Sequence, residues 1–241
     1  MTGSVKTEAI VLRSLRYGEA DRILHLYTPD RGRIGAIAKG VRRTRSRFGG
    51  RLEPFFRVRL VLYEGRSELL TVTSVETIDP HARLRLDAGG LDSAARACDA
   101  VGRIFETTEP HAAVYNLLSN QLALLDADPA RATHANALAF RLKLLIAAGL
   151  VPQLAACATC GSTEHLVGFS AAAGGVVCSA CEAASFPLDE STHAFMTAAV
   201  SRPLAEVPTT SPRCLRQAER AIGEMLEHHA HLRLRSAARP A

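Results

Sequence analysis

The sequence predicts an α+β fold, in which a five-stranded β-barrel at the amino end is followed by an α-helical domain with an inserted four-cysteine zinc module. Three observations lead to this prediction: short alternating runs of apolar and polar residues before Pro80, Ala- and Leu-rich segments of helical period after it, and two C-x-x-C pairs within the helical part. The chain has 241 residues, of which 47% are hydrophobic, so it can fill one large core or two or three small ones.

The strands of the barrel are expected before Pro80, where Val, Ile, Thr and aromatic residues dominate and turn-forming residues separate the runs. The last two runs, FFRVRLVLY and ELLTVTSVE, alternate most regularly, and the residues between them suit a hairpin turn. Five strands in so short a segment indicate a small closed barrel. The expected strands are Val5–Leu12, Arg22–Tyr27, Ile34–Val41, Phe55–Tyr63 and Glu68–Ile78.

Helices are expected after Pro80, because apolar residues there recur with a period of about 3.6. Gly149 followed by Pro152 is a stop signal for the third of them. The expected helices cover 91–107, 112–126, 131–149, 189–201 and 211–230. The expected domains are the barrel at 1–80, a helical domain at 81–155, a zinc module at 156–185, and carboxy-terminal helices at 186–241 that pack on the helical domain.

Neither a membrane span nor a secretion signal is indicated, because no run approaches about 18 uncharged apolar residues and the amino end lacks a cleavable apolar segment. The expected location is therefore the cytoplasm. Thiols stay reduced there, so the 6 cysteines are expected to bind metal or to pack as small apolar residues.

The two C-x-x-C pairs, Cys157–Cys160 and Cys178–Cys181, are separated by 17 residues, a spacing typical of a four-thiolate zinc site. An insert of this size cannot bury a sufficient core, so one structural Zn²⁺ would supply its folding free energy, and four sulfurs leave no open position for catalysis. A redox dithiol and an iron–sulfur cluster are the alternatives. His165 is expected to be an exposed loop residue, and Cys98 and Cys214 to be buried packing residues.

Positive charge is concentrated at the amino end. Residues 1–70 hold 15 Lys and Arg against 7 Asp and Glu, whereas the remainder holds 14 against 17. This asymmetry indicates a polyanionic partner, and a solvated surface that keeps the protein soluble is the alternative. The six cations expected to bind phosphate lie between the third and fourth strands: Lys39, Arg42, Arg43, Arg45, Arg47 and Arg51.

Aromatic residues near this basic loop are candidates for stacking on bases: Phe48, Phe55 and Phe56. Either Phe55 or Phe56 is expected to point into the barrel instead. A targeting signal or a merely soluble basic run is the alternative for the loop as a whole. The secondary phosphate candidates are Arg13, Arg16, Arg22, Arg31 and Arg33, although Arg13 and Arg22 can equally pair with Glu19 or Asp21.

The chain resembles the family of the bacterial recombination mediator and DNA repair protein RecO, nearly from end to end. The resemblance is carried by EAIVLRSLRYGEADRILHLYTPDRGRIGAIAKGVRRTRSRFGGRLEPF at 8–55, SELLTVTSVE at 67–76, and GLVPQLAACATCG at 149–161, followed by the second cysteine pair. The first block is specific, because its Tyr-Gly-Glu, Thr-Pro-x-x-Gly-Arg and Ala-Lys-Gly-x-Arg elements occur in order. The zinc block alone would not identify a family.

This resemblance implies an oligonucleotide-binding (OB) barrel, a helical domain and a zinc module, in a protein without catalytic residues that binds single- and double-stranded DNA and anneals complementary strands. It also implies three partners in recombinational repair: RecR, the acidic carboxy-terminal tail of single-strand-binding protein and, indirectly, the recombinase RecA. Arg141 and Lys143 are candidate cations for that tail, and the alternative is that they form the solvated side of a helix. Some relatives lack the cysteines, so the metal is expected to be a scaffold.

Two other classes of protein compete with this interpretation. A nuclease or deaminase would need clustered acids or a His-x-Glu motif ahead of the cysteines, and the sequence has neither pattern. An RNA-binding or ribosome-associated zinc-ribbon protein fits the composition equally well, and only the family blocks disfavour it.

Overall fold

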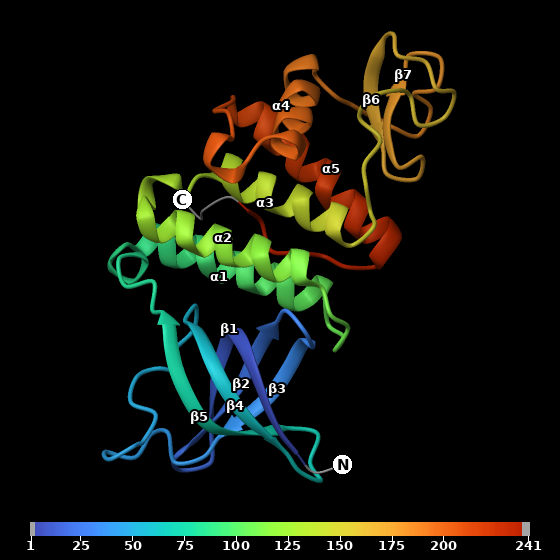
Figure 1. Ribbon diagram of the computed structural model, residues 1–241. Helices are drawn as coiled ribbons and strands as arrows, with labels where there is room; N and C mark the ends of the chain where they lie inside the picture. The colour runs from blue at the N-terminus through green and yellow to red at the C-terminus, as the bar shows by residue number, and fades with distance from the viewer. Residues whose placement is uncertain (1–2, 238–241) are drawn as a thin grey trace. The chain divides into compact units, whose positions relative to one another are not determined.

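The computed structural model describes residues 3–237, and the chain divides into two compact units, Met1–Pro129 and Ala130–Ala241 (Figure 1). The helices expected together at 81–155 are divided between these units, so the domain boundaries drawn from the sequence stay a prediction.

The first unit contains the expected five-stranded barrel, which is closed in the order β1-β2-β3-β5-β4. Its strands are β1 (Gly3–Tyr17), β2 (Asp21–Thr28), β3 (Gly32–Ala38), β4 (Arg57–Glu64) and β5 (Leu70–Asp79). Neighbouring strands are antiparallel except for β3 and β5, which are parallel. The prediction of a five-stranded barrel is thus confirmed.

The first strand is longer than the sequence suggested, because it serves two partners. Its first half pairs with β4 and its second half with β2, and the register shifts between Val11 and Arg13, which marks a bulge. A bulge bends a strand and increases its local twist, which lets one strand contribute to both sides of a small barrel. The strand therefore continues to Tyr17 rather than ending at Leu12.

The barrel core is filled by alternate residues of the strands, such as Leu24 and Leu26 of β2 and Leu60 and Leu62 of β4, which are all fully buried. Phe48 and Leu52 belong to the same core although they lie between β3 and β4. The expectation that Phe48 stacks on bases is therefore wrong, because its side chain is 1% exposed. Phe56 is partly buried against the core, as expected for one of the Phe55–Phe56 pair.

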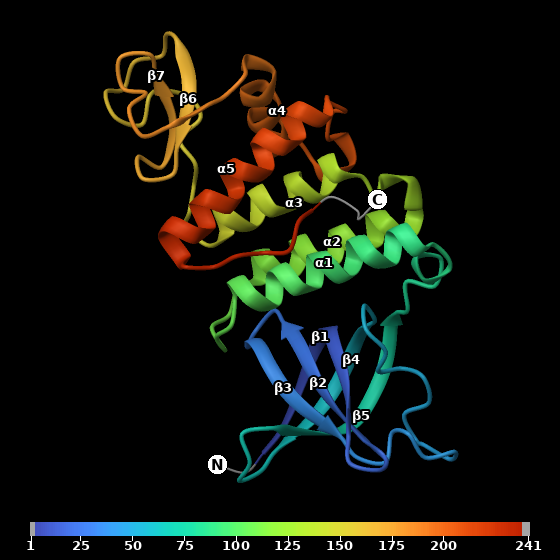
Figure 2. The same ribbon diagram turned by 180° about the vertical axis from the view of Figure 1, so that it is seen from behind.

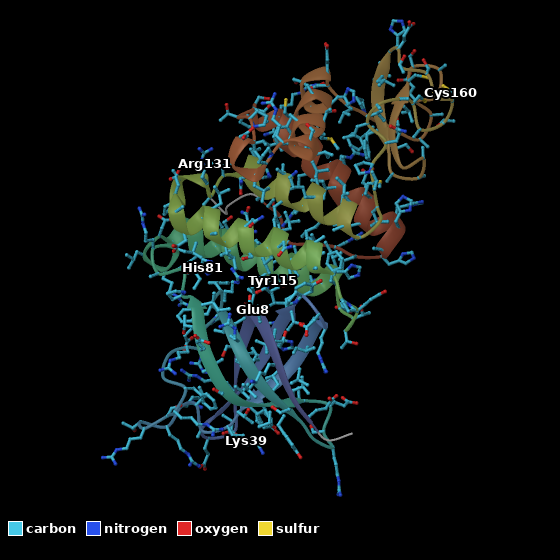
Figure 3. All side chains as sticks on the ribbon, viewed as in Figure 1. Glu8, Lys39, His81, Tyr115, Arg131 and Cys160 are labelled. Atoms are coloured by element: carbon cyan, nitrogen blue, oxygen red, sulfur yellow. The ribbon has the colours of Figure 1, made fainter. Side chains whose placement is uncertain are left out.

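Two helices complete the first unit, α1 (Ala88–Ile104) and α2 (Ala112–Ala127), and they lie side by side over one end of the barrel (Figures 1 and 2). Asp87 caps α1 by accepting a hydrogen bond from Gly90 N at 2.6 Å. The barrel is joined to α2 through Tyr115, whose hydroxyl accepts from Arg57 Nε at 3.2 Å and lies 3.4 Å from Glu8 Oε2; the Tyr115 and Glu8 side chains approach one another in Figure 3.

The second unit contains three helices, α3 (His134–Ala147), α4 (Glu190–Ser201) and α5 (Pro212–Ala230). Thr133 caps α3, and Ser211 caps α5 ahead of Pro212 in its first turn. Between α3 and α4 the chain forms a small sheet in the order β7-β6-β8, from β6 (Leu166–Ser170), β7 (Gly175–Cys178) and β8 (Phe186–Pro187). All five helices expected from the sequence are present, with ends shifted by a few residues.

Within residues 3–237, the structure contains no helix with both the length and the apolar character that a bilayer crossing requires.

Candidate nucleic-acid interface and metal centre

The basic loop, residues 39–53, follows β3 and brings all six predicted cations to the surface. Lys39 and the five arginines are exposed, and none of them forms an ion pair with any carboxylate in residues 3–237. Figure 3 shows Lys39 at the end of the barrel opposite α1 and α2. A surface with so many unpaired cations can bind an anion without first breaking ion pairs of its own.

The loop is folded although it contains neither helix nor strand. Backbone turns link Arg43 N to Gly40 O at 3.1 Å, Ser46 N to Arg43 O at 3.0 Å, and Arg51 N to Phe48 O at 3.3 Å. These turns direct the arginines outward while Phe48 and Leu52 enter the barrel core. The Arg47 guanidinium lies 4.8 Å from the centroid of the Phe48 ring.

Two contacts fasten the start of the loop to the β1–β2 turn. Asp21 Oδ1 accepts a hydrogen bond from Gly40 N at 2.7 Å, and Arg42 N donates to Ala20 O at 2.9 Å. The end of the loop is held by Glu53, whose carboxylate accepts from Arg22 Nη1 at 2.9 and 3.0 Å. These side-chain contacts had no local sequence signal, because Asp21 and Gly40 lie 19 positions apart and Arg22 and Glu53 lie 31 positions apart.

The secondary candidates fall into two groups. Arg22, Arg31 and Arg33 pair with Glu53, Glu64 and Glu106 respectively, so the alternative that Arg22 pairs with Glu19 or Asp21 is wrong. Arg13 and Arg16 are exposed and make no ion pair within the described residues. Burial, together with the charges of Arg33 and Arg13, lowers the pKa of His25, so the outer face of the barrel near Arg13 favours a neutral imidazole.

The four predicted metal ligands come together in the second unit. The sulfurs of Cys157, Cys160, Cys178 and Cys181 all lie within 4.8 Å of one another, and Cys160 Sγ is 3.7 Å from Cys178 Sγ. The first pair lies on a turn closed by a hydrogen bond from Gly161 N to Cys157 O at 2.9 Å, with Gly161 at φ +79°. The second pair lies where β7 ends, and Cys181 N donates to Cys178 O at 2.9 Å. This arrangement can hold one metal ion and is compatible with zinc.

The electrostatics of the cysteine cluster also suit a cation. Backbone N–H groups of Cys160 and Cys178 lower the pKa of Cys157 to about 6. Hydrogen bonds with the neighbouring sulfurs of Cys160 and Cys178 raise the pKa of Cys181 to about 12, and the charge of Cys157 adds a smaller effect in the same direction. A divalent ion would favour the deprotonated form of all four sulfurs, and the all-sulfur donor set is one that zinc favours.

The remaining cysteines and His165 lie outside this cluster. Cys98 and Cys214 are 2% and 3% exposed, as expected for packing residues, and His165 is exposed. His165 still supports the site, because its carbonyl accepts a hydrogen bond from Ser179 N at 3.1 Å, next to Cys178.

Arg141 and Lys143 of α3 do not form the solvated side of a helix. Arg141 is 5% exposed; it pairs with Glu219 at 3.6 Å and donates to the carbonyl of Arg235. Lys143 Nζ donates to Val200 O at 2.9 Å. Both side chains hold neighbouring segments of the second unit, which argues against their availability to an acidic peptide.

Two family descriptions match the chain: "Recombination protein O N terminal" over residues 1–81 and "Recombination protein O C terminal" over residues 87–238. Among curated proteins, a "DNA repair protein RecO" of Anaeromyxobacter sp. (strain K) is 38% identical over 95% of this chain and 93% of its own length. Proteins of the same name from Rubrobacter xylanophilus and Nocardioides sp. are 39% and 37% identical; they cover 90% and 97% of this chain and 88% and 97% of their own lengths.

Proposed function

The chain belongs to the recombination protein O family, and from this premise we propose that it is a non-enzymatic DNA-binding protein of recombinational repair, which binds single- and double-stranded DNA and anneals complementary strands. The observation that carries the proposal is the basic loop, which holds six exposed cations without a carboxylate partner in residues 3–237. Phosphate is the ligand chemistry that such a surface fits best.

The attachment of the loop to the barrel also supports the proposal that the loop binds DNA. Phe48 and Leu52 fix the loop to the barrel core, so less backbone entropy is lost when the arginines contact phosphate. Contacts between arginine and phosphate hold a strand without reading its sequence, which lets two bound strands slide into register. The basic loop would thus promote annealing by neutralising the repulsion between two polyanions.

A salt titration tests the proposal. If about five of the cations contact single-stranded phosphate, log K should fall with log salt at a slope of roughly −3.5. The variant with Arg42, Arg43, Arg45 and Arg47 all changed to Gln should bind every sequence more weakly, with a shallower slope, and should anneal complementary strands more slowly.

A matched control removes the same charge elsewhere. Four other exposed arginines, changed together to Gln, should leave binding and annealing near those of the unaltered protein: Arg66, Arg83, Arg202 and Arg216. An equal loss of DNA affinity in both variants would mean that net charge alone explains the effect. A DNA affinity that does not change with salt concentration would contradict the proposal. Annealing without nucleotide or added divalent metal separates this function from that of an ATP- or metal-dependent enzyme. Competition between single-stranded DNA and RNA of equal length separates it from an RNA-binding zinc ribbon.

The four cysteines are proposed to hold one structural Zn²⁺, which would fix the fold of the insert between α3 and α4. Four thiolates fill a tetrahedral shell, so the ion would have no position for substrate. The metal is therefore assigned to the scaffold and not to the annealing step.

The wider role proposed for this chain is to help load the recombinase RecA onto single-stranded DNA that is coated by single-strand-binding protein, together with RecR, in the cytoplasm and at the nucleoid. This part rests on membership of the family. Arg141 and Lys143, the candidates for the acidic tail, are engaged within the second unit, which argues against their binding this partner.

A further inference from the structure

Exposed aromatic rings are rare on this chain, which has 4 tyrosines, 8 phenylalanines and no tryptophan. Every phenylalanine in residues 3–237 is buried or half-buried, and so are Tyr27 and Tyr115. The two exposed rings are those of Tyr17, which is 53% exposed, and Tyr63, which is 45% exposed. A single exposed ring needs no explanation by itself, so its surroundings must decide its role.

Tyr17 is connected to the basic loop through Asp21. It is the last residue of β1 and is paired with Asp21, the first residue of β2, so the two side chains share one face of the sheet. The Asp21 carboxylate accepts from Gly40 N at 2.7 Å, at the start of the basic loop. Tyr17 is therefore one cross-strand neighbour away from the backbone that begins the loop.

The Arg43 side chain lies close to the backbone of Gly40. Gly40 has φ +68°, and a Cβ added to it would lie 3.5 Å from the Arg43 side chain, so the arginine folds back over Gly40. The exposed Arg43 side chain thus lies near Gly40, and the exposed Tyr17 is the strand partner of Asp21, which accepts from Gly40 N. Leu15, which is 38% exposed two positions before Tyr17, extends the apolar surface along the same face of β1.

From this arrangement we infer that Tyr17 stacks on an unpaired base of the DNA strand whose phosphates the basic loop binds, with Arg43 at a neighbouring phosphate. The inference rests on the proposed function and deepens it, because it assigns a residue that contacts the bases of the bound single strand. Every base has a π face, so such stacking favours single strands over duplexes without selecting a sequence. Tyr17 takes the role that Phe48 cannot fill from inside the barrel core.

The test uses the full chain and three DNA probes of equal length: a single strand, a single strand whose bases are replaced by abasic sites, and a duplex. The Tyr17→Ala variant should bind the normal single strand about five-fold more weakly or worse, because loss of one aromatic stack has an effect of that size. Its affinities for the abasic strand and the duplex should equal those of the unaltered protein. Tyr17→Phe should bind normally, because it keeps the ring.

The matched control is Tyr63→Ala, which removes the other exposed ring. Tyr63 pairs with Ser4 and Thr71 and shares no strand partner with Tyr17, so this variant should bind the single strand normally. Photocrosslinking of the unaltered protein to a strand that contains iodouracil, followed by mass spectrometry, should mark Tyr17, and this measurement is independent of how any variant folds.

The outcomes distinguish a failure of the stacking role of Tyr17 from a failure of the proposed function. If Tyr17→Ala binds the single strand normally, or loses equal affinity for the abasic strand, Tyr17 does not stack, although salt-dependent binding by the loop can stand. If the unaltered protein binds no single-stranded DNA, the proposed function and the stacking role both fail.

Discussion

Arg22 at the start of β2 and Glu53, which precedes β4, form an ion pair in which one guanidinium nitrogen lies 2.9 and 3.0 Å from the two carboxylate oxygens. The pair closes the basic loop at its far end, while Asp21 holds its near end through Gly40 N. Two successive residues of β2 thereby fasten both ends of a loop that contains no regular secondary structure.

The coupling between Arg22 and Glu53 can be measured with a double-mutant cycle of Arg22→Gln and Glu53→Gln. Their side chains are 23% and 38% exposed, so solvent screening should limit the coupling free energy to about 0.5 to 1 kcal/mol. Urea unfolding of the four proteins provides the measurement. Strictly additive single effects would mean that the pair adds nothing to stability.

Truncation of Phe48 should destabilise the barrel although the residue lies in a loop. Phe48→Ala removes a ring that is 1% exposed and should lower the free energy of unfolding by about 3 kcal/mol. The freed loop should also be cut by trypsin at its arginines faster than in the unaltered protein. The neighbouring change Arg47→Ala, at an exposed position, should cost less than about 1 kcal/mol, and equal effects of the two variants would contradict the assignment of Phe48 to the core.

Removal of metal should unfold the module at 156–185 that contains the four clustered cysteines, and it should leave the barrel folded. A chelator should raise hydrogen exchange at Ala158 N and Cys181 N, whereas Val11 N, which is bonded within the first unit, should stay protected. Cys157→Ala should abolish stoichiometric zinc in the purified protein.

The controls for the metal prediction are Cys98→Ala and Cys214→Ala, which change buried cysteines outside the cluster and should retain one zinc ion per chain. Zinc retained by Cys157→Ala at the level of these controls would be incompatible with a four-thiolate site.

Acidification should lower the stability of the first unit, because it protonates Glu8. Hydrogen bonds from Arg57 and, after the opposing effect of burial, from Arg59 lower the pKa of Glu8 below its ordinary value of 4.5. Because the folded-state pKa is lower than the unfolded one, the stabilisation is fully present above pH 4.5 and is lost as the pH falls through the folded pKa. Glu8→Gln should therefore show a smaller loss of stability on acidification, measured by thermal unfolding from about pH 6 to about pH 3.

Glu76→Gln is the matched control for Glu8, since Glu76 is 69% exposed and Arg59 is its one ion-pair partner within residues 3–237. That variant should keep the acid dependence of the unaltered protein. If Glu8→Gln keeps it too, the contacts of Glu8 with Arg57 and Tyr115 contribute little to the stability of the first unit.

Local patterns in the sequence were enough to predict the elements of the fold and the residues that make up both candidate sites. Alternation predicted five strands, helical periodicity predicted five helices, and the spacing of two C-x-x-C pairs predicted one cysteine cluster. Each signal depends on neighbours only a few positions apart, so no long-range information was needed. The six cations of the basic loop were visible for the same reason, and all six are exposed.

Tertiary contacts decided the direction and availability of individual side chains. Sequence alone could not tell that Phe48 is inside the barrel, because a loop has no period from which to read its faces. Nor could it tell that Tyr17 is outside the barrel, because the bulge between Val11 and Arg13 shifts the register of β1. Nor could it tell that Arg22 and Arg141 are paired while Arg43 is free of carboxylates within residues 3–237, since their acidic partners lie tens of residues away. Local sequence patterns thus determined that this protein carries a concentration of positive charge near its amino end and two cysteine pairs, whereas packing determined which side chains are exposed, paired or brought together.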